Sequence, residues 1–198
     1  MRKKDIDRFF LKVSSRIKIP FQIYLTGGVA SWFLGGNRPT HDIDFALKTK
    51  KEWEQIEQII REVSRELSIA VEFSEDISRW GMIGISDFEK GAKLYKRFGS
   101  IDVYILDPLI WSVGKLSRYT IDDISDLEKV FKRNKIQPQK AMRVWAEAFL
   151  ESPHSSEKNM FVKKVNDFLK NSGRKIWGGN FRSELGFQRF KQAAKLKN

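Results

Sequence analysis

The sequence predicts an α/β protein, in which a core of strands and helices is followed by an α-helical C-terminal region. Apolar strand-like runs, one with clean period-two alternation, recur up to Leu106. From Pro108 onward the apolar residues recur mainly at spacings of three and four, which is typical of helices. We therefore divide the chain into an α/β core at 1–107 and a helical region with a basic tail at 108–198.

Alternating helical and strand patterns define the predicted elements of the core. Its amphipathic helices keep their charged residues off one face, and its strands are bounded by Gly, Pro and polar turns. Residues 74–91 suggest only a short helical turn and part of a strand. The predicted elements are helices at 3–17, 29–34 and 53–67, and strands at 22–26, 42–47, 68–73, 92–98 and 101–106.

Capping residues mark the helices of the second half. Asp107 and Pro108 suit an N-cap and a first helical position, and Thr120 followed by Asp123 resembles a capping arrangement. Helices are predicted at 108–119, 120–134, 138–150 and 156–170. From Gly173 we expect a less ordered basic tail with one helix at 187–196. Trp145 is assigned to the core, whereas Trp177 is left open between the core and an RNA-stacking surface.

Two aspartates lie in the stretch "IYLTGGVASWFLGGNRPTHDIDFAL". Residues i and i+2 of a strand share a face, so Asp42 and Asp44 are expected side by side. Two carboxylates at that spacing repel each other, and a hard cation such as Mg²⁺ would make the arrangement favourable. Upstream, Gly27 and Gly28 would let a triphosphate approach backbone N–H groups near a helix N-terminus.

This order of a strand, Gly-Gly, a spacer and Asp-apolar-Asp resembles the nucleotidyltransferase superfamily, which has the polymerase-beta-like fold. The "GNRPTHDID" segment is similar to its branch of abortive-infection-type nucleotidyltransferase toxins. The resemblance covers roughly the first two thirds of the chain. It implies a nucleotidyltransferase-like mixed sheet, NTP (including ATP) as donor, and a toxin of a toxin–antitoxin or phage-defence pair with a cognate antitoxin.

Transfer of a nucleotide calls for about three carboxylates around two Mg²⁺ ions, or Mn²⁺ in their place. Asp42 and Asp44 supply two. Asp102 in "SIDVYIL" is the preferred third ligand, and it could activate the attacking hydroxyl. The resemblance implies the same assignment. Glu72 and Asp87 are rivals, and Glu72 is the stronger because "IAVEFSE" is itself strand-like.

Several further residues are candidates for nucleotide binding. Gly27 and Gly28 would cradle phosphates with backbone donors, and Ser31 could add a hydroxyl. Arg38 could hold a phosphate or the acceptor, or be a surface arginine in a salt bridge. Each also has a purely structural interpretation, a tight turn for the glycines and a small helix residue for Ser31.

A second informative stretch is "LIWSVGKLSRYTIDDISDLEKV". Lys115 lies in a mostly apolar helical run, where an ammonium is costly unless it meets an anion. The toxin resemblance implies that Lys115 reaches the nucleotide phosphates and that Asp126 supports the site. An ion-pair set that joins Lys115 or Arg118 to Asp123 and Asp126 is the open alternative.

The amino-acid composition limits the classes of partner and the compartment that we expect for this protein. The 198 residues hold 37 Lys and Arg against 25 Asp and Glu, a net charge of +12, and 151–198 hold 11 basic and four acidic residues. Such a field favours polyanions. Cysteine is absent, the N-terminus does not read as a signal peptide, and no apolar run approaches roughly 20 residues. We therefore expect a cytoplasmic protein with no membrane partner.

These observations predict a Mg²⁺-dependent nucleotidyltransferase that moves an NMP from an NTP to a macromolecular hydroxyl and releases pyrophosphate. The acceptor would be an RNA 3′ end, such as that of tRNA, or a protein side chain. One alternative is a small-molecule, antibiotic-type nucleotidyltransferase, although the positive charge disfavours cationic acceptors. The other is a catalytically inactive module of the same fold that binds nucleic acid or a partner protein.

Overall fold

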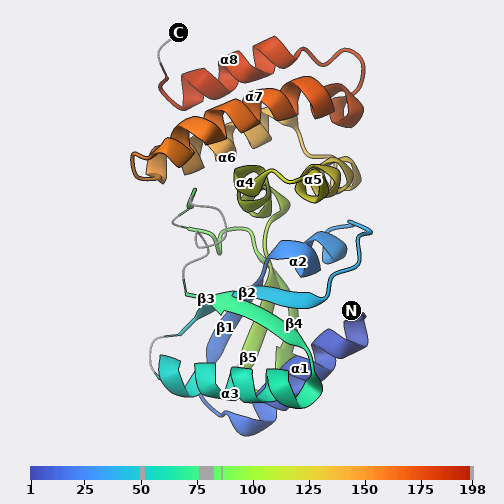
Figure 1. Ribbon diagram of the computed structural model, residues 1–198, viewed down its shortest axis with the longest axis vertical. Helices are drawn as coiled ribbons and strands as arrows, with labels where there is room; N and C mark the ends of the chain where they lie inside the picture. The colour runs from blue at the N-terminus through green and yellow to red at the C-terminus, as the bar shows by residue number, and fades with distance from the viewer. Residues whose placement is uncertain (50–51, 76–82, 86, 197–198) are drawn as a thin grey trace. The chain divides into compact units, whose positions relative to one another are not determined.

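The computed structural model describes residues 1–49, 52–75, 83–85 and 87–196 (Figure 1). They fall into two compact units. Unit 1 takes its described residues from 1–33, 38–76 and 89–107, and unit 2 from 34–37, 77–88 and 108–198. Each unit is described by itself.

Unit 1 is built on a five-stranded mixed sheet with the order β3-β2-β1-β5-β4. The central strand β1 runs antiparallel to β2 and parallel to β5, while β2 is parallel to β3 and β4 is antiparallel to β5. The predicted α/β class with a mixed sheet is thus confirmed. The strands are β1 (Phe21–Leu25), β2 (Asp42–Lys48), β3 (Ala70–Ser74), β4 (Lys93–Phe98) and β5 (Ile101–Ile105).

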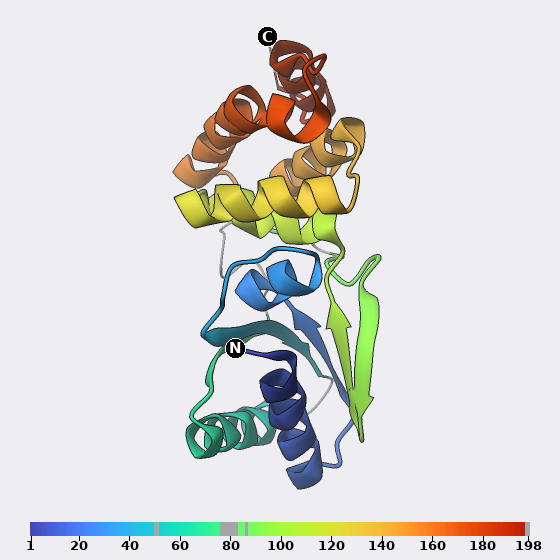
Figure 2. The same ribbon diagram turned by 90° about the vertical axis from the view of Figure 1, so that its right-hand side faces the viewer.

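One face of this sheet is buried under α1 (Lys3–Arg16) and α3 (Trp53–Leu67), which lie next to one another (Figure 2). The Phe10 ring of α1 meets Phe45 of β2 edge-on at 5.9 Å and Phe98 of β4 at 5.8 Å. Strand side chains alternate between faces, so the odd-numbered residues of β2 enter this core. The even-numbered ones, including Asp42 and Asp44, project from the opposite face.

The strand and helix predictions for unit 1 are confirmed to within two residues at most boundaries. A tight turn joins β4 to β5 at Gly99, which has a φ of +58°. The helix after β1 differs most at its start, because α2 spans Gly27–Phe33 and includes the Gly pair. Within 74–91, residues 76–82 and 86 lie outside the described residues, and residues 87–91 form a turn.

Unit 2 contains five helices within its described residues. Its core is aromatic: Phe131 stacks on Trp145 at 6.0 Å, and Trp145 meets Phe168 edge-on at 5.8 Å. The indole N–H of Trp145 donates to Ser112 Oγ at 2.9 Å, which satisfies its buried polar group. The core assignment of Trp145 is confirmed. The helices are α4 (Pro108–Arg118), α5 (Ile121–Arg133), α6 (Pro138–Glu151), α7 (Ser156–Trp177) and α8 (Ser183–Ala193).

The prediction of a less ordered tail from Gly173 is wrong. Helix α7 continues through Gly173 to Trp177 and ends where Gly178 adopts a φ of +91°. Gly173 is needed within the helix because a Cβ there would lie 2.4 Å from the Phe181 ring. The chain then returns as α8, whose Phe190 is fully buried and meets Phe149 at 6.3 Å.

Within the described residues, the helices are all too short or too polar to cross a membrane.

Candidate functional site

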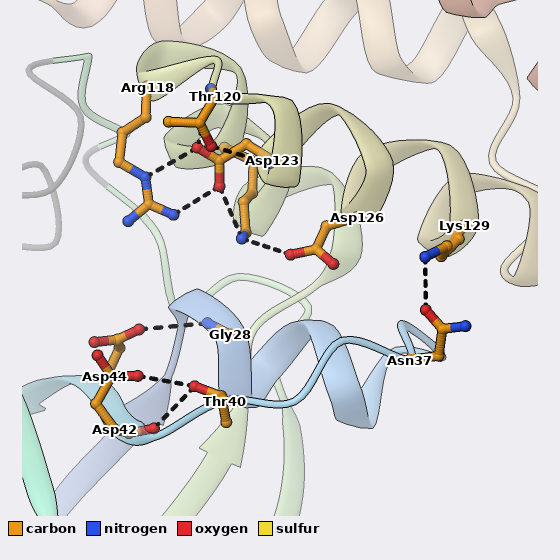
Figure 3. Close-up of polar contacts among 11 residues, drawn as sticks. Gly28, Asn37, Thr40, Asp42, Asp44, Arg118, Thr120, Asp123, Asp126 and Lys129 are labelled. Atoms are coloured by element: carbon orange, nitrogen blue, oxygen red, sulfur yellow. Dashed lines mark hydrogen bonds and ion pairs between the residues drawn. The ribbon is translucent and has the colours of Figure 1, made fainter.

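The candidate site of unit 1 is the turn between β1 and α2, together with the start of β2. Gly27 has a φ of +57°, which an L side chain rarely adopts, and a Cβ on it would lie 1.7 Å from Oδ2 of Asp44. The same oxygen accepts a hydrogen bond from the Gly28 N–H at 3.3 Å (Figure 3). Glycine at position 27 therefore makes room for the Asp44 carboxylate against the helix start.

Asp42 is held by Thr40. The Thr40 hydroxyl lies 2.8 Å from Oδ1 of Asp42 and 3.2 Å from its backbone oxygen. Figure 3 shows the Asp42 and Asp44 carboxylates next to one another, as the i, i+2 spacing predicts. Asp44 is only 8% exposed, whereas Asp42 is half-buried. The pair thus combines one fixed carboxylate with one more accessible to solvent.

Gly28 faces Thr40 and Arg38. A Cβ on Gly28 would lie 2.7 Å from Thr40 Oγ1 and 3.8 Å from a terminal guanidinium nitrogen of Arg38. The structure therefore brings Arg38 beside the Gly pair, a proximity that the sequence did not predict. Neutralising cationic groups near a phosphate site favour anion binding.

Ser31 lies one turn into α2 and is 2% exposed. Among the described residues its hydroxyl has no hydrogen-bond partner. A buried hydroxyl without a partner is costly, and a ligand oxygen or a water would relieve that cost. This observation fits the predicted role of Ser31 towards a phosphate.

The register does not bring Asp102 to the pair. Asp102 of β5 is aligned with Gln22 of β1, which is aligned with Lys48 of β2. Lys48 is four residues beyond Asp44, so Asp102 lies roughly 13 Å farther along the strands and two strands across. Its carboxylate instead pairs with Arg97 at 3.0 Å. The structure therefore separates the three carboxylates that the sequence was expected to join.

Glu72, unlike Asp102, lies in register with the aspartate pair. In the parallel pairing of β2 and β3, Glu72 is aligned directly with Asp44. Aligned residues of neighbouring strands share a face and lie about 5 Å apart. Glu72 is exposed. The register thus favours the stronger of the two rivals considered for the third carboxylate.

The carboxylates at this edge suit a single Mg²⁺ ion that is shared with a substrate, rather than one enclosed by protein ligands alone. Within the described part of the chain, no group of three or more His, Cys, Asp or Glu residues is arranged to hold a metal. Mg²⁺ is usually bound by one or two carboxylates together with substrate phosphates. Asp42 and Asp44 meet that requirement, and Glu72 is the in-register carboxylate that could join them.

Unit 2 holds a separate cluster around Lys115. This ammonium is 2% exposed and lies 2.9 Å from Oδ1 of Asp123 and 2.8 Å from Oδ2 of Asp126. Arg118 reaches both oxygens of Asp123, at 2.9 and 3.3 Å (Figure 3). Two cations and two carboxylates therefore balance within one network, whose members are buried except for Arg118.

The local sequence explains how Asp123 is placed. The Thr120 hydroxyl accepts from the Asp123 N–H at 3.1 Å, and Oδ2 of Asp123 accepts from the Thr120 N–H at 3.3 Å. This capping box starts α5 and turns the carboxylate back towards α4. Burial alone would raise the pKa of Asp123, but hydrogen bonds and charge from Arg118 and Lys115 outweigh it, so its pKa lies below its usual value.

The network matches the ion-pair interpretation left open for this stretch. Lys115 and Asp126 come together as the sequence suggested, and Asp123 and Arg118 join them. Lys115 has two carboxylates as counter-ions, so the burial of this ammonium needs no ligand to explain it. A role of Lys115 or Asp126 towards a nucleotide stays a prediction.

The sequence motifs did not single out Thr40, although its hydroxyl fixes the more exposed carboxylate of the pair. Its position two residues before Asp42 was the available signal, because Thr side chains commonly bond to groups two residues on.

Comparisons of this chain with protein-family models, with curated proteins and with solved structures find no match.

Proposed function

We propose that unit 1 is a Mg²⁺-dependent nucleotidyltransferase of the polymerase-beta-like kind, which transfers an NMP to a macromolecular hydroxyl. One observation carries the proposal: the Asp44 carboxylate occupies the space that Gly27 leaves and accepts the Gly28 N–H, next to Asp42. This joins a backbone turn suited to phosphates with two oxygen ligands suited to Mg²⁺.

In the proposed reaction, the acceptor hydroxyl oxygen forms a bond to the α-phosphorus of the NTP while the bond to the pyrophosphate oxygen breaks. Bound Mg²⁺ would neutralise phosphate charge and align the reacting groups. Arg38 and Ser31 would contact phosphate oxygens, and Asp42 and Asp44 would hold the metal. Glu72 is the candidate to accept the proton of the attacking hydroxyl.

The test incubates the purified protein with α-labelled NTPs, Mg²⁺ and total RNA or lysate, and follows the label in RNA and protein. Asp44→Asn keeps the side-chain shape but removes the charge. We expect it to lower labelling at least about a hundredfold, because a bound metal contributes several kcal/mol to the transition state. A protein that labels no acceptor under any of these conditions contradicts the proposal.

A matched pair of variants locates the third carboxylate. Glu72→Gln should lower labelling strongly, whereas Asp102→Asn, which alters an exposed pair with Arg97, should leave it nearly unchanged. The reverse result would show that the reaction depends on Asp102, whose register position separates it from Asp44.

The separation of Asp102 from the pair favours one second candidate. A module with only Asp42 and Asp44 could bind Mg²⁺ and NTP without transferring the nucleotide. Calorimetry distinguishes the two: Mg²⁺-dependent NTP binding that Asp44→Asn abolishes, without labelling of any acceptor, identifies the binding module.

Membership of a toxin–antitoxin pair, with a cognate antitoxin as partner, would be tested by expressing the protein and its Asp44→Asn variant and comparing growth.

A further inference from the structure

Unit 2 carries a groove between the α5–α6 connection and the segment that links α7 to α8. Its two parts, of about 510 and 310 Å³, share four wall residues and so form one continuous depression. These volumes lie at the scale of ligand sites. The shared residues are Pro138, Gln139, Asn180 and Phe181.

The charged side chains that line this groove, among the described residues, are all basic. Lys132 and Lys135 come from the end of α5 and the loop after it, and Arg182 and Arg189 from α8 and the residue before it. All four are exposed. Lys135 has a φ of +49°, which turns the loop back so that the Ile136 N–H donates to Phe131 O at 3.1 Å. A wall with charge of one sign attracts a polyanion.

Two aromatic rings in the groove are fixed by their surroundings. The Trp177 and Phe181 centroids are 4.6 Å apart at an angle of 42°, and both residues are half-exposed. The Trp177 N–H donates to Ile136 O at 2.8 Å, and Phe181 packs where Gly173 and Gly186 lack side chains. Rings held in this way lose little entropy when a base stacks on them.

Three amide side chains, Gln137, Gln139 and Asn180, complete the polar lining. An amide both donates and accepts hydrogen bonds, which suits base edges and the ribose 2′-hydroxyl. Cations, fixed rings and amides are together the components of a single-stranded nucleic-acid site. An acidic peptide would use the cations but would gain little from stacking surfaces.

We propose that this groove binds single-stranded RNA, with phosphates on the four basic side chains and at least one base on Trp177 or Phe181. The inference is independent of the nucleotidyl transfer proposed for unit 1, because the binding needs neither NTP nor metal. A failure of either proposal therefore leaves the other standing.

The experiment measures the fluorescence anisotropy of a labelled ten-nucleotide RNA of mixed sequence, titrated with the full chain in EDTA without NTP. The arms are the same sequence as single-stranded DNA, a ribose-phosphate strand without bases, and an acidic peptide of equal charge. We expect the RNA to bind most tightly, and the strand without bases to bind at least about fivefold more weakly, which corresponds to the lower end of one stacked base.

Two kinds of variant locate the binding in the groove. Arg182→Gln/Arg189→Gln removes two lining charges, and Lys163→Gln/Lys170→Gln removes two exposed charges from α7 that are not among the lining residues. The first pair should weaken RNA binding severalfold more than the second. Phe181→Leu keeps an apolar side chain but removes a stacking face, and it should weaken RNA binding without affecting peptide binding.

Equal losses from the two charge pairs would overturn the proposal, because they would show attraction to general basic charge. The proposal also fails if the acidic peptide binds as tightly as the RNA, which would indicate a protein-docking surface. Circular dichroism of each variant confirms that the fold is kept. Since Arg182, Arg189, Lys163 and Lys170 are all exposed, the charge variants are expected to fold even if Phe181→Leu does not.

Discussion

At the scale of single residues, Gly27 controls the geometry of the candidate site. We expect Gly27→Ala to displace the Asp44 carboxylate, because the new Cβ would lie 1.7 Å from Oδ2. The left-handed backbone adds about 1 to 2 kcal/mol of strain for a residue with a Cβ. The variant should lose at least that much free energy of unfolding in urea, and should lose NTP binding measured by calorimetry.

Gly114→Ala is the matched control. Gly114 lies within α4, and a Cβ there would meet no atom within 4 Å. Alanine in a helix interior is more favourable than glycine by about 0.5 to 1 kcal/mol. The control should therefore raise stability slightly and leave nucleotide binding unchanged, and a similar loss in both variants would contradict the special role of Gly27.

The sequence predicts which face a side chain occupies more reliably than how far along the sheet it lies. The alternation in β2 and β5 correctly places Asp42, Asp44 and Asp102 on one face. The end of the sheet at which Asp102 lies depends on the pairing of β1 with β5, which aligns it with Gln22. Pairing register arises from contacts distant in sequence, so the local pattern of "SIDVYIL" could not supply it.

At the scale of elements, most boundaries follow from local signals such as Pro108, Thr120 and the amphipathic faces. The tail could not be predicted in this way, because the glycines that suggest a flexible segment are packing positions. Gly173 and Gly186 receive the Phe181 ring, which joins α7 to α8. Only a tertiary contact shows that a glycine is there to admit a neighbouring side chain.

The link between α4 and α5 is the buried network of Lys115. We expect Lys115→Met to destabilise unit 2 by about 3 to 5 kcal/mol, because it leaves buried carboxylates without their cation. Lys115→Met/Asp126→Asn removes both partners of one pair and should recover part of the loss. Urea unfolding followed by tryptophan fluorescence measures the free energy of unfolding of Lys115→Met, of Asp126→Asn and of the double variant. A double variant that loses the sum of the single effects would contradict the coupling of Lys115 to Asp126.

The same network predicts a loss of stability in acid. The pKa of Asp123 in the folded state lies below its ordinary value of 3.8. The ionised form is therefore favoured by folding, and this stabilisation is present above pH 3.8 and is lost as the pH falls through the folded pKa. The urea midpoint should fall below pH 4 more steeply for the natural chain than for Asp123→Asn. Parallel curves would show that Asp123 does not contribute.

At the scale of the whole molecule, the two proposals give the two units different means of holding an anion. Unit 1 offers a glycine turn beside two carboxylates, which binds phosphate well only with a cation present. Unit 2 offers exposed Lys and Arg side chains in a groove with aromatic rings. The net charge of +12 favours a polyanionic partner, which stays a prediction, but composition could not indicate which of the basic residues line one groove.

Salt dependence separates these contributions for RNA binding. For single strands the logarithm of affinity falls against the logarithm of salt concentration with a slope of about −0.7 for each phosphate neutralised. Four basic side chains in the groove would give a slope of about −3, and Arg182→Gln/Arg189→Gln should make it shallower by about 1.4. Anisotropy titrations from 50 to 200 mM salt provide the slopes.

The Lys163→Gln/Lys170→Gln variant should retain the slope of the natural chain, since its lost charges lie on exposed positions of α7 outside the groove lining. A slope that changes equally in both variants would mean that the RNA is held by diffuse charge rather than by contacts in the groove.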